Sequence, residues 1–272
     1  TEGLLQYQHE HPEVRYFVEY LLATRAPGVL EQQEWVSYLQ NKYADLGVDI
    51  LIADSDYAAQ LVTAFPRMLG SVPQVLYTGG LVAQEPFQLV MQPSVQRAVE
   101  GTVELAVRQN PNARRVIVIE GNNPSSQHAL GYLYTVLDDL GLETVSVPEG
   151  PITQMQSAVA AAQQNAFAVY SLVFSDGSGA RVVPRDVLAA LAPVSPVPVY
   201  SFWSSLIGTG LVGGVMIDAR QTARSMMDEA LTFHFTGTFN ATYETSRTFV
   251  DWSAATHHGI SPDTIPTDAV VL

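Results

Sequence analysis

Small polar and acidic residues follow several apolar runs of this sequence. Asp54, Ser55 and Asp56 follow VDILIA, and Ser175 and Asp176 follow AVYSLVF. Aspartates can hold an amine, whereas hydroxyls near a helix N-terminus can hold a carboxylate. A pocket that offered both would suit an amino acid or a similar small zwitterion.

Three further runs end in the same way. They add the candidate contacts Tyr77, Thr78, Asn122, Asn123, Phe202 and Trp203. Aromatic rings can stack on a flat or apolar ligand body. A second interpretation stays open, because Asp, Ser and Asn are also common helix caps and turn formers, and aromatic residues usually belong to the core.

Other kinds of chemistry have little support in the sequence. It contains no cysteine, which excludes disulfides, thiolate catalysis and cysteine-ligated metals. It contains no GxSxG elbow and no P-loop, and GTGLVGG at 208–214 fits a tight crossover better than a dinucleotide motif. His257 and His258 are adjacent and cannot share one helix face, so we predict no metal and no cofactor. Asp54 and Asp56 could act as acid and base, and an enzyme therefore remains an alternative.

Composition limits the partners. The 272 residues include 27 acidic and 13 basic ones, a net charge of −14. This charge argues against binding to nucleic acid or to an anionic membrane surface. Hydrophobic residues make up 47% of the chain, which permits a sizeable core. The sequence has no apolar run long enough to span a bilayer, and its first residues do not resemble a signal peptide.

The apolar runs alternate with amphipathic segments, as in an α/β protein with parallel sheets. We expect strands at residues 14–22, 48–53, 74–77, 115–119, 144–147, 168–174, 197–202 and 247–250. We expect helices at 31–45, 57–69, 94–109, 126–140, 153–164, 184–191 and 219–234. The alternation occurs twice, with a break at 81–93, so the fold class is α/β with two doubly wound, Rossmann-like lobes and a cleft between them.

The segment LVFSDGSGARVVPRDVLAALA resembles an element of one large bacterial group. PQVLYTGG, EGTVELAVRQNPNARRVIVIEGN and PVYSFWSSLIGTGLVGGVMID match other parts of that group in the same order. The group comprises the type I periplasmic-binding-protein-like sensor domains of histidine kinases and diguanylate cyclases, which are related to the solute-binding proteins of ABC transporters. The resemblance covers nearly the whole chain, although the usual first strand is absent and ATRAPG replaces an Asp-containing loop.

The resemblance implies an N-terminal lobe of residues 1–92 plus about 211–240, and a C-terminal lobe of 93–210 plus about 241–272. It implies a periplasmic, extracytoplasmic sensor domain without enzymatic activity, attached to the inner membrane by flanking segments outside this chain. Such a domain would bind a small polar solute between its lobes and would form a homodimer if a kinase or cyclase follows. The alternatives are a solute-binding protein of an ABC importer and a sensor that acts through a partner protein.

Overall fold

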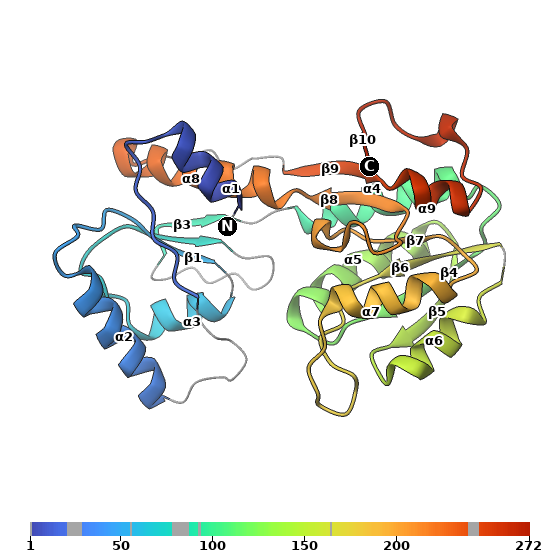
Figure 1. Cartoon of the computed structure of the whole chain (residues 1–272), viewed down its shortest axis with the longest axis horizontal. Helices are drawn as coiled ribbons and strands as arrows, with labels where there is room; N and C mark the ends of the chain where they lie inside the picture. Colours follow the sequence, from blue (N-terminus) through green and yellow to red (C-terminus); the bar gives the residue numbers. More distant parts are fainter. Residues whose placement is uncertain are drawn as a thin grey trace. The chain divides into compact units, whose positions relative to one another are not determined.

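The structure, a computed structural model, describes residues 2–20, 29–54, 56–77, 87–91, 94–163, 165–238 and 245–272. The chain forms two compact units (Figure 1). Unit 1 comprises Thr1–Pro93 and Ala219–Thr245, and unit 2 comprises Ser94–Asp218 and Ser246–Leu272. None of the helices in the described residues is long and apolar enough to cross a membrane.

Helices and strands alternate through most of both units. Unit 1 contains α1 (Glu2–Glu10), α2 (Val29–Tyr43), β1 (Leu51–Asp54), α3 (Asp56–Ala64), β2 (Gln74–Tyr77), β3 (Leu89–Met91) and α8 (Ala219–Thr236). The first part of unit 2 contains α4 (Val95–Gln109), β4 (Arg115–Glu120), α5 (Pro124–Asp139), β5 (Glu143–Pro148), α6 (Ile152–Ala160) and β6 (Ala166–Tyr170). The rest contains α7 (Pro184–Leu191), the short helix η1 (Ala192–Val194), β7 (Val199–Tyr200), the short helix η2 (Ser204–Leu206), β8 (Gly213–Ile217), β9 (Ser246–Val250), α9 (Trp252–His257), the short helix η3 (Pro262–Thr264) and β10 (Val270–Val271).

Unit 1 is built on a parallel sheet with the strand order β1-β2-β3. One apolar cluster joins the sheet to α2 and α3, and a second joins it to α8 and Leu4 of α1. Helix α1 is fixed to α8 by two polar contacts. Tyr7 Oη donates to Asp228 Oδ1 at 2.6 Å, and Arg224 lies 2.6 Å from Glu10.

The predicted strand at 14–22 is wrong over the residues that the structure describes there. Residues 14–20 form neither helix nor strand, and Leu21 and Leu22 lie outside the described part. Among the described residues, no strand pairs with this segment, so its apolar side chains have no sheet to join. Phe17 and Tyr20 are 51% and 66% exposed, which a core strand would not permit.

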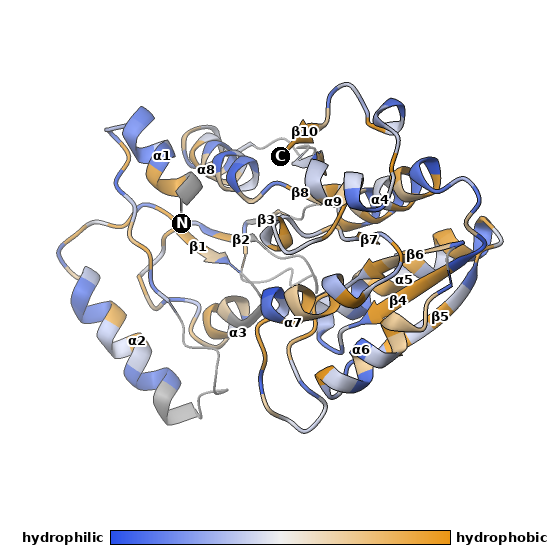
Figure 2. Cartoon of the chain, turned by 45° about the vertical axis from the view of Figure 1, so that its right-hand side comes forward, coloured by the Kyte–Doolittle hydropathy of each residue, from blue (hydrophilic) through white to orange (hydrophobic). Residues whose placement is uncertain are grey.

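Unit 2 is built on a larger sheet with the strand order β10-β9-β8-β7-β6-β4-β5. Every pair of neighbouring strands is parallel except β8 and β9, which are antiparallel. Apolar side chains of α4 and α5 cover one face, and those of α6 and α7 cover the other. Because both faces are buried, β4 and β6 are hydrophobic along most of their length, as Figure 2 shows.

Two glycines of the predicted crossover allow backbones to approach closely. A Cβ on Gly213 would lie 2.2 Å from Phe249 O, and one on Gly214 would lie 1.9 Å from Ser201 O. The crossover belongs to unit 2, because β8 pairs with β7 and β9. The chain therefore leaves unit 2 after Asp218 and not near residue 211, where we expected the change of lobe.

Strand β6 ends earlier than predicted, at Tyr170 instead of Phe174. Ser171 N still donates to Ile119 O at 2.9 Å. One residue further along the chain, the backbone carbonyl of Leu172 accepts hydrogen bonds from the side chains of Asn123 and Ser126. Side-chain donors thus take the place of a neighbouring strand at this point.

Candidate functional site

The parallel strands of unit 2 bring their carboxyl ends to one edge of the sheet. In open α/β sheets this edge carries the ligand-binding loops. We define the carboxyl edge of unit 2 as residue 120, the last of β4, together with residues 121–123, 149–150, 171–176, 203–205 and 218, which follow β4, β5, β6, β7 and β8. The predicted contacts Asn122, Asn123, Ser175, Asp176, Phe202 and Trp203 all lie on or beside it.

The loop after β4 is held by the cap of α5. Asn123 Oδ1 accepts from Ser126 N at 3.0 Å, so Asn123 is the N-cap that the second interpretation allowed. Its Nδ2 donates to Leu172 O at 2.7 Å and thereby joins the loops after β4 and β6. Asn122 differs, because its side chain is exposed while its backbone N–H donates to Glu149 Oε2 at 3.1 Å. Asn122 is therefore the residue of this pair whose side chain a ligand can reach.

The acidic loop after β6 closes on itself. Asp176 Oδ1 accepts from Ser178 Oγ at 2.7 Å, from Ser178 N at 2.9 Å and from Ala180 N at 3.2 Å. These bonds, led by the Ser178 hydroxyl, lower the pKa of Asp176 below its usual value. Ser175 Oγ similarly accepts from Gly177 N at 3.1 Å. Both side chains have a structural role in the loop, and Asp176 keeps its charge for any contact beyond it.

The two aromatic residues after β7, Phe202 and Trp203, differ in their surroundings. Phe202 is completely buried among apolar residues, so the expectation that it contacts a ligand is replaced by a packing role. Trp203 is half-buried and forms a parallel bridge with Ile217. Among the described residues, its indole N–H has no hydrogen-bond partner. The following turn is fixed by Arg185, which donates to Ser205 O at 2.9 Å and Ile207 O at 2.7 Å.

Three charged residues at this edge were not predicted from the sequence as site residues. Glu149 follows β5, Asp218 follows β8, and Arg247 lies in β9 with its Nη1 3.9 Å from Asp218 Oδ2. Glu120, the last residue of β4, accepts a hydrogen bond from Tyr134, whose pKa is raised by burial and by this carboxylate. Glu149 could have been found by the rule that located the others, because it closely follows a predicted strand. The edge as a whole is rich in carboxylates.

The predicted contacts of unit 1 lie on its own sheet edge. Asp54 is the last residue of β1 and is paired in register with Tyr77 at the end of β2. Asp54 is exposed, and partial removal of water from its carboxylate raises its pKa. Asp56 begins α3, and the side chains of Asp56 and Tyr77 lie outside the described part, as do Ser55 and Thr78. Asp54 is therefore the only one of these five whose side chain can be described.

A metal centre is not apparent in the residues that the structure describes. No three of their histidine, aspartate and glutamate side chains form a group that could hold an ion. His258 is half-buried, and burial lowers its pKa, which fits a histidine packed at the end of α9.

Comparison with known proteins identifies the fold. The sequence matches no protein-family model and no curated protein. Solved structures do match. An ABC domain from Streptococcus pneumonia, in complex with L-Trp, has 12% sequence identity and a TM-score of 0.68, over 99% of this chain and 93% of that one.

Two further structures are similar at comparable identity. An ABC transporter solute-binding protein from Thermobispora bispora matches with 17% identity and a TM-score of 0.57, over 97% of this chain and 83% of that one. A carbohydrate transporter solute-binding protein from Agrobacterium radiobacter, in complex with D-arabinose, matches with 11% identity and a TM-score of 0.52, over 80% and 79%. The α/β prediction with parallel-dominated sheets is confirmed, and the chain has the fold of type I periplasmic binding proteins.

Proposed function

We propose that this chain is a binding domain for a small polar solute, and that the carboxyl edge of unit 2 supplies ligand contacts. The observation that carries the proposal is the gathering of reachable polar residues at the ends of adjacent parallel strands. Asn122 is exposed, and Glu149 and Ser204 are half-buried. Trp203 is half-buried beside them and contributes its ring, since its indole nitrogen is shielded from solvent. Open α/β sheets bind small molecules at this edge, where polar groups from several loops converge.

The charge of this edge favours some solutes over others. Glu120, Glu149, Asp176 and Asp218 contribute carboxylates. Of the nearby cations, Arg185 is engaged with backbone carbonyls, and Arg247 Nη1 lies 3.9 Å from Asp218 Oδ2. A cationic or neutral group is therefore preferred beside this unit, while an anionic group would meet like charge. The expectation that the ligand binds in a cleft between the two lobes stays a prediction.

Two biological roles are compatible with such a domain. The resemblance of LVFSDGSGARVVPRDVLAALA and the other matching segments favours the extracytoplasmic sensor of a membrane receptor, in which ligand binding shifts a conformational equilibrium. The similar solved structures include solute-binding proteins of transporters, which support a solute-binding protein of an ABC importer equally well. Both roles assign binding, and not turnover, to this domain.

A thermal-shift screen with amino acids, amines, sugars and organic acids tests the proposal. A ligand at a hundredfold excess over its Kd stabilises the folded state by about 2.7 kcal/mol. We expect a hit whose shift is reduced by Asn122→Ala and by Glu149→Gln, whereas Asn41→Ala, at an exposed position of α2 in unit 1, leaves it unchanged. A hit that is indifferent to both edge variants would overturn the assignment of the site, and a screen without any hit would contradict small-solute binding.

The two roles are separated by a different measurement. The full-length gene should encode a downstream membrane helix and a kinase or cyclase module if the chain is a sensor domain. A signal sequence followed by a lipidated cysteine, next to transporter genes, would instead support the importer.

A further inference from the structure

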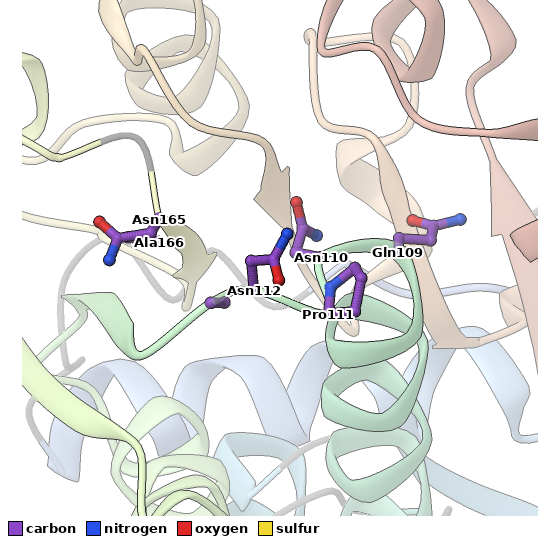
Figure 3. Close-up of a pocket in the computed structure, with 7 residues that line it drawn as sticks. Gln109, Asn110, Pro111, Asn112, Asn165 and Ala166 are labelled. Atoms are coloured by element: carbon purple, nitrogen blue, oxygen red, sulfur yellow. The ribbon is translucent and has the colours of Figure 1, made fainter.

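A pocket of about 480 Å³ lies in unit 2 at the end of the sheet opposite the carboxyl edge (Figure 3). It is lined by the end of α4, the loop that leads to β4, and the residues at the start of β6. This volume falls in the range of about 300–1,000 Å³ that small-molecule sites occupy. Because it lies at the amino ends of β4 and β6, it is separate from the proposed solute site.

The pocket is lined mainly by neutral amide side chains. Gln109, Asn110, Asn112 and Asn165 contribute four carboxamides, and none of the lining residues is charged. Arg114 follows the lining loop, but its guanidinium donates to the carbonyl of Ala113 at 3.0 Å. A site of this composition selects for hydrogen-bonding capacity and not for charge.

Backbone hydrogen bonds make the walls of the pocket rigid. Arg114 N donates to Asn165 O at 3.0 Å and so joins the two loops that line it. Ala113 N donates to Asn110 O at 2.9 Å, and Asn110 also caps the C-terminus of α4. The amides are therefore presented from fixed backbone positions, which reduces the entropy lost on binding.

Two of the amides are oriented by a buried tyrosine. Tyr200 Oη donates to Gln109 Oε1 at 2.8 Å and accepts from Asn110 Nδ2 at 2.9 Å. Asn110 Nδ2 also donates to Ala106 O at 2.8 Å. Gln109 is only 7% exposed, and its Nε2 has no hydrogen-bond partner among the described residues. A buried amide donor left unpaired costs free energy, but this nitrogen is shielded from solvent, so Gln109 shapes the wall of the pocket and does not present a donor to it.

The other two amides are open to solvent. Asn112 and Asn165 are exposed, and their side chains make no hydrogen bond to any described residue. Each carboxamide offers two donors and one acceptor oxygen. Hydroxyl groups are complementary, because every hydroxyl both donates and accepts. The ring of Pro111 adds a small apolar surface that can contact C–H groups.

From this arrangement we infer that the amide pocket, formed by Gln109, Asn110, Pro111, Asn112 and Asn165, is a second binding site for a neutral polyhydroxylated compound of monosaccharide size. Its ligand would be recognised by hydroxyl groups held between amides from three segments of unit 2. The site does not depend on the proposed function, since it shares no residue with the carboxyl edge.

The test is a titration of the ¹⁵N-labelled chain with D-glucose, D-galactose and myo-inositol up to tens of millimolar, observed through side-chain NH₂ resonances. We expect saturable shifts at Asn110, Asn112 and Asn165, and loss of saturation in Asn112→Asp/Asn165→Asp, which replaces neutral donors by charged acceptors. Asn41→Asp, at an exposed position of α2 in unit 1 that belongs to neither proposed site, is the matched control and should leave the titration unchanged. Absence of shifts at the three pocket amides, or shifts confined to Asn122, would overturn the inference, and the second result would still support the proposed solute site.

Discussion

The side-chain amide of Asn123 donates a 2.7 Å hydrogen bond to the carbonyl oxygen of Leu172, 49 residues further along the chain. The same side chain caps α5 through Ser126 N. Asn123 thus lies at the end of the loop after β4, caps the first turn of α5, and occupies the backbone carbonyl of Leu172 just beyond the end of β6. The positions of the loops at the carboxyl edge depend on this residue.

Replacing Asn123 should separate these two roles. Asn123→Ala removes both the cap and the donor to Leu172 O, and we expect a loss of about 1–2 kcal/mol in the free energy of unfolding. Asn123→Ser keeps an oxygen that can accept from Ser126 N and should recover roughly half of that loss. Urea denaturation of the three proteins measures both values. Equal stability of the alanine variant and the wild type would refute the role in capping.

Two buried serines at the ends of β6 and β7 form a matched pair. Ser171 and Ser201 are both completely buried, but Ser201 Oγ donates to Tyr170 O at 2.8 Å, whereas Ser171 Oγ has no partner among the described residues. We expect Ser201→Ala to cost about 1 kcal/mol, and Ser171→Ala to be neutral or to stabilise by up to about 1 kcal/mol. Thermal and urea unfolding decide the order. A larger loss at Ser171 would show that its hydroxyl is paired after all.

Two glycines test the close approach at the carboxyl edge. A Cβ on Gly121 would lie 1.7 Å from Leu172 O, a distance that requires the backbone to move. Gly121→Ala should therefore lower stability by about 3 kcal/mol or more. Gly131 lies in α5 with nothing within 4 Å of a new Cβ, and Gly131→Ala should stabilise the helix by about 0.5–1 kcal/mol. Similar midpoints of denaturation for the two variants would contradict this account.

The loop of Asp176 should respond to acid. Its pKa is lowered in the folded chain, so its stabilising contribution is present above the unfolded pKa of about 3.9 and is lost as the pH falls through the folded value. An NMR titration of the Asp176 carboxyl carbon should give a midpoint below about 3.9. Ser178→Ala removes the strongest donor and should move the midpoint upward. An ordinary midpoint in the wild type, or no change in the variant, would exclude the hydrogen-bonded loop.

Several elements could be predicted from the sequence because local pattern and tertiary role agree. RVIVI is apolar on both faces and forms the interior strand β4 between β6 and β5, and Gly213 and Gly214 of GTGLVGG lie where backbones approach closely. Residues 14–20 show the limit of that approach. They have the composition of a strand, but a strand also needs a partner, and composition does not reveal whether one is present.

The candidate site was harder to predict than the fold. The position of a residue after a strand led us to expect Asn122 and Trp203 at the site, but it could not distinguish an exposed side chain such as that of Asn122 from a cap such as Asn123 or a core residue such as Phe202. That distinction depends on which loops meet in space. The amide pocket escaped prediction for the same reason, because its asparagines come from loops at the other ends of the strands.

The interleaved course of the chain has a consequence for biosynthesis. Tyr7 of α1 reaches its hydrogen-bond partner Asp228 across 221 residues of sequence. Unit 1 cannot be completed on the ribosome until α8 has emerged, by which time residues 94–218 of unit 2 have already been made. Unit 1 therefore remains incomplete while residues 94–218 are made, and unit 2 in turn requires Ser246–Leu272, which follow α8. Closure of these long-range contacts, more than local helix formation, should set the rate at which both units reach their final structure.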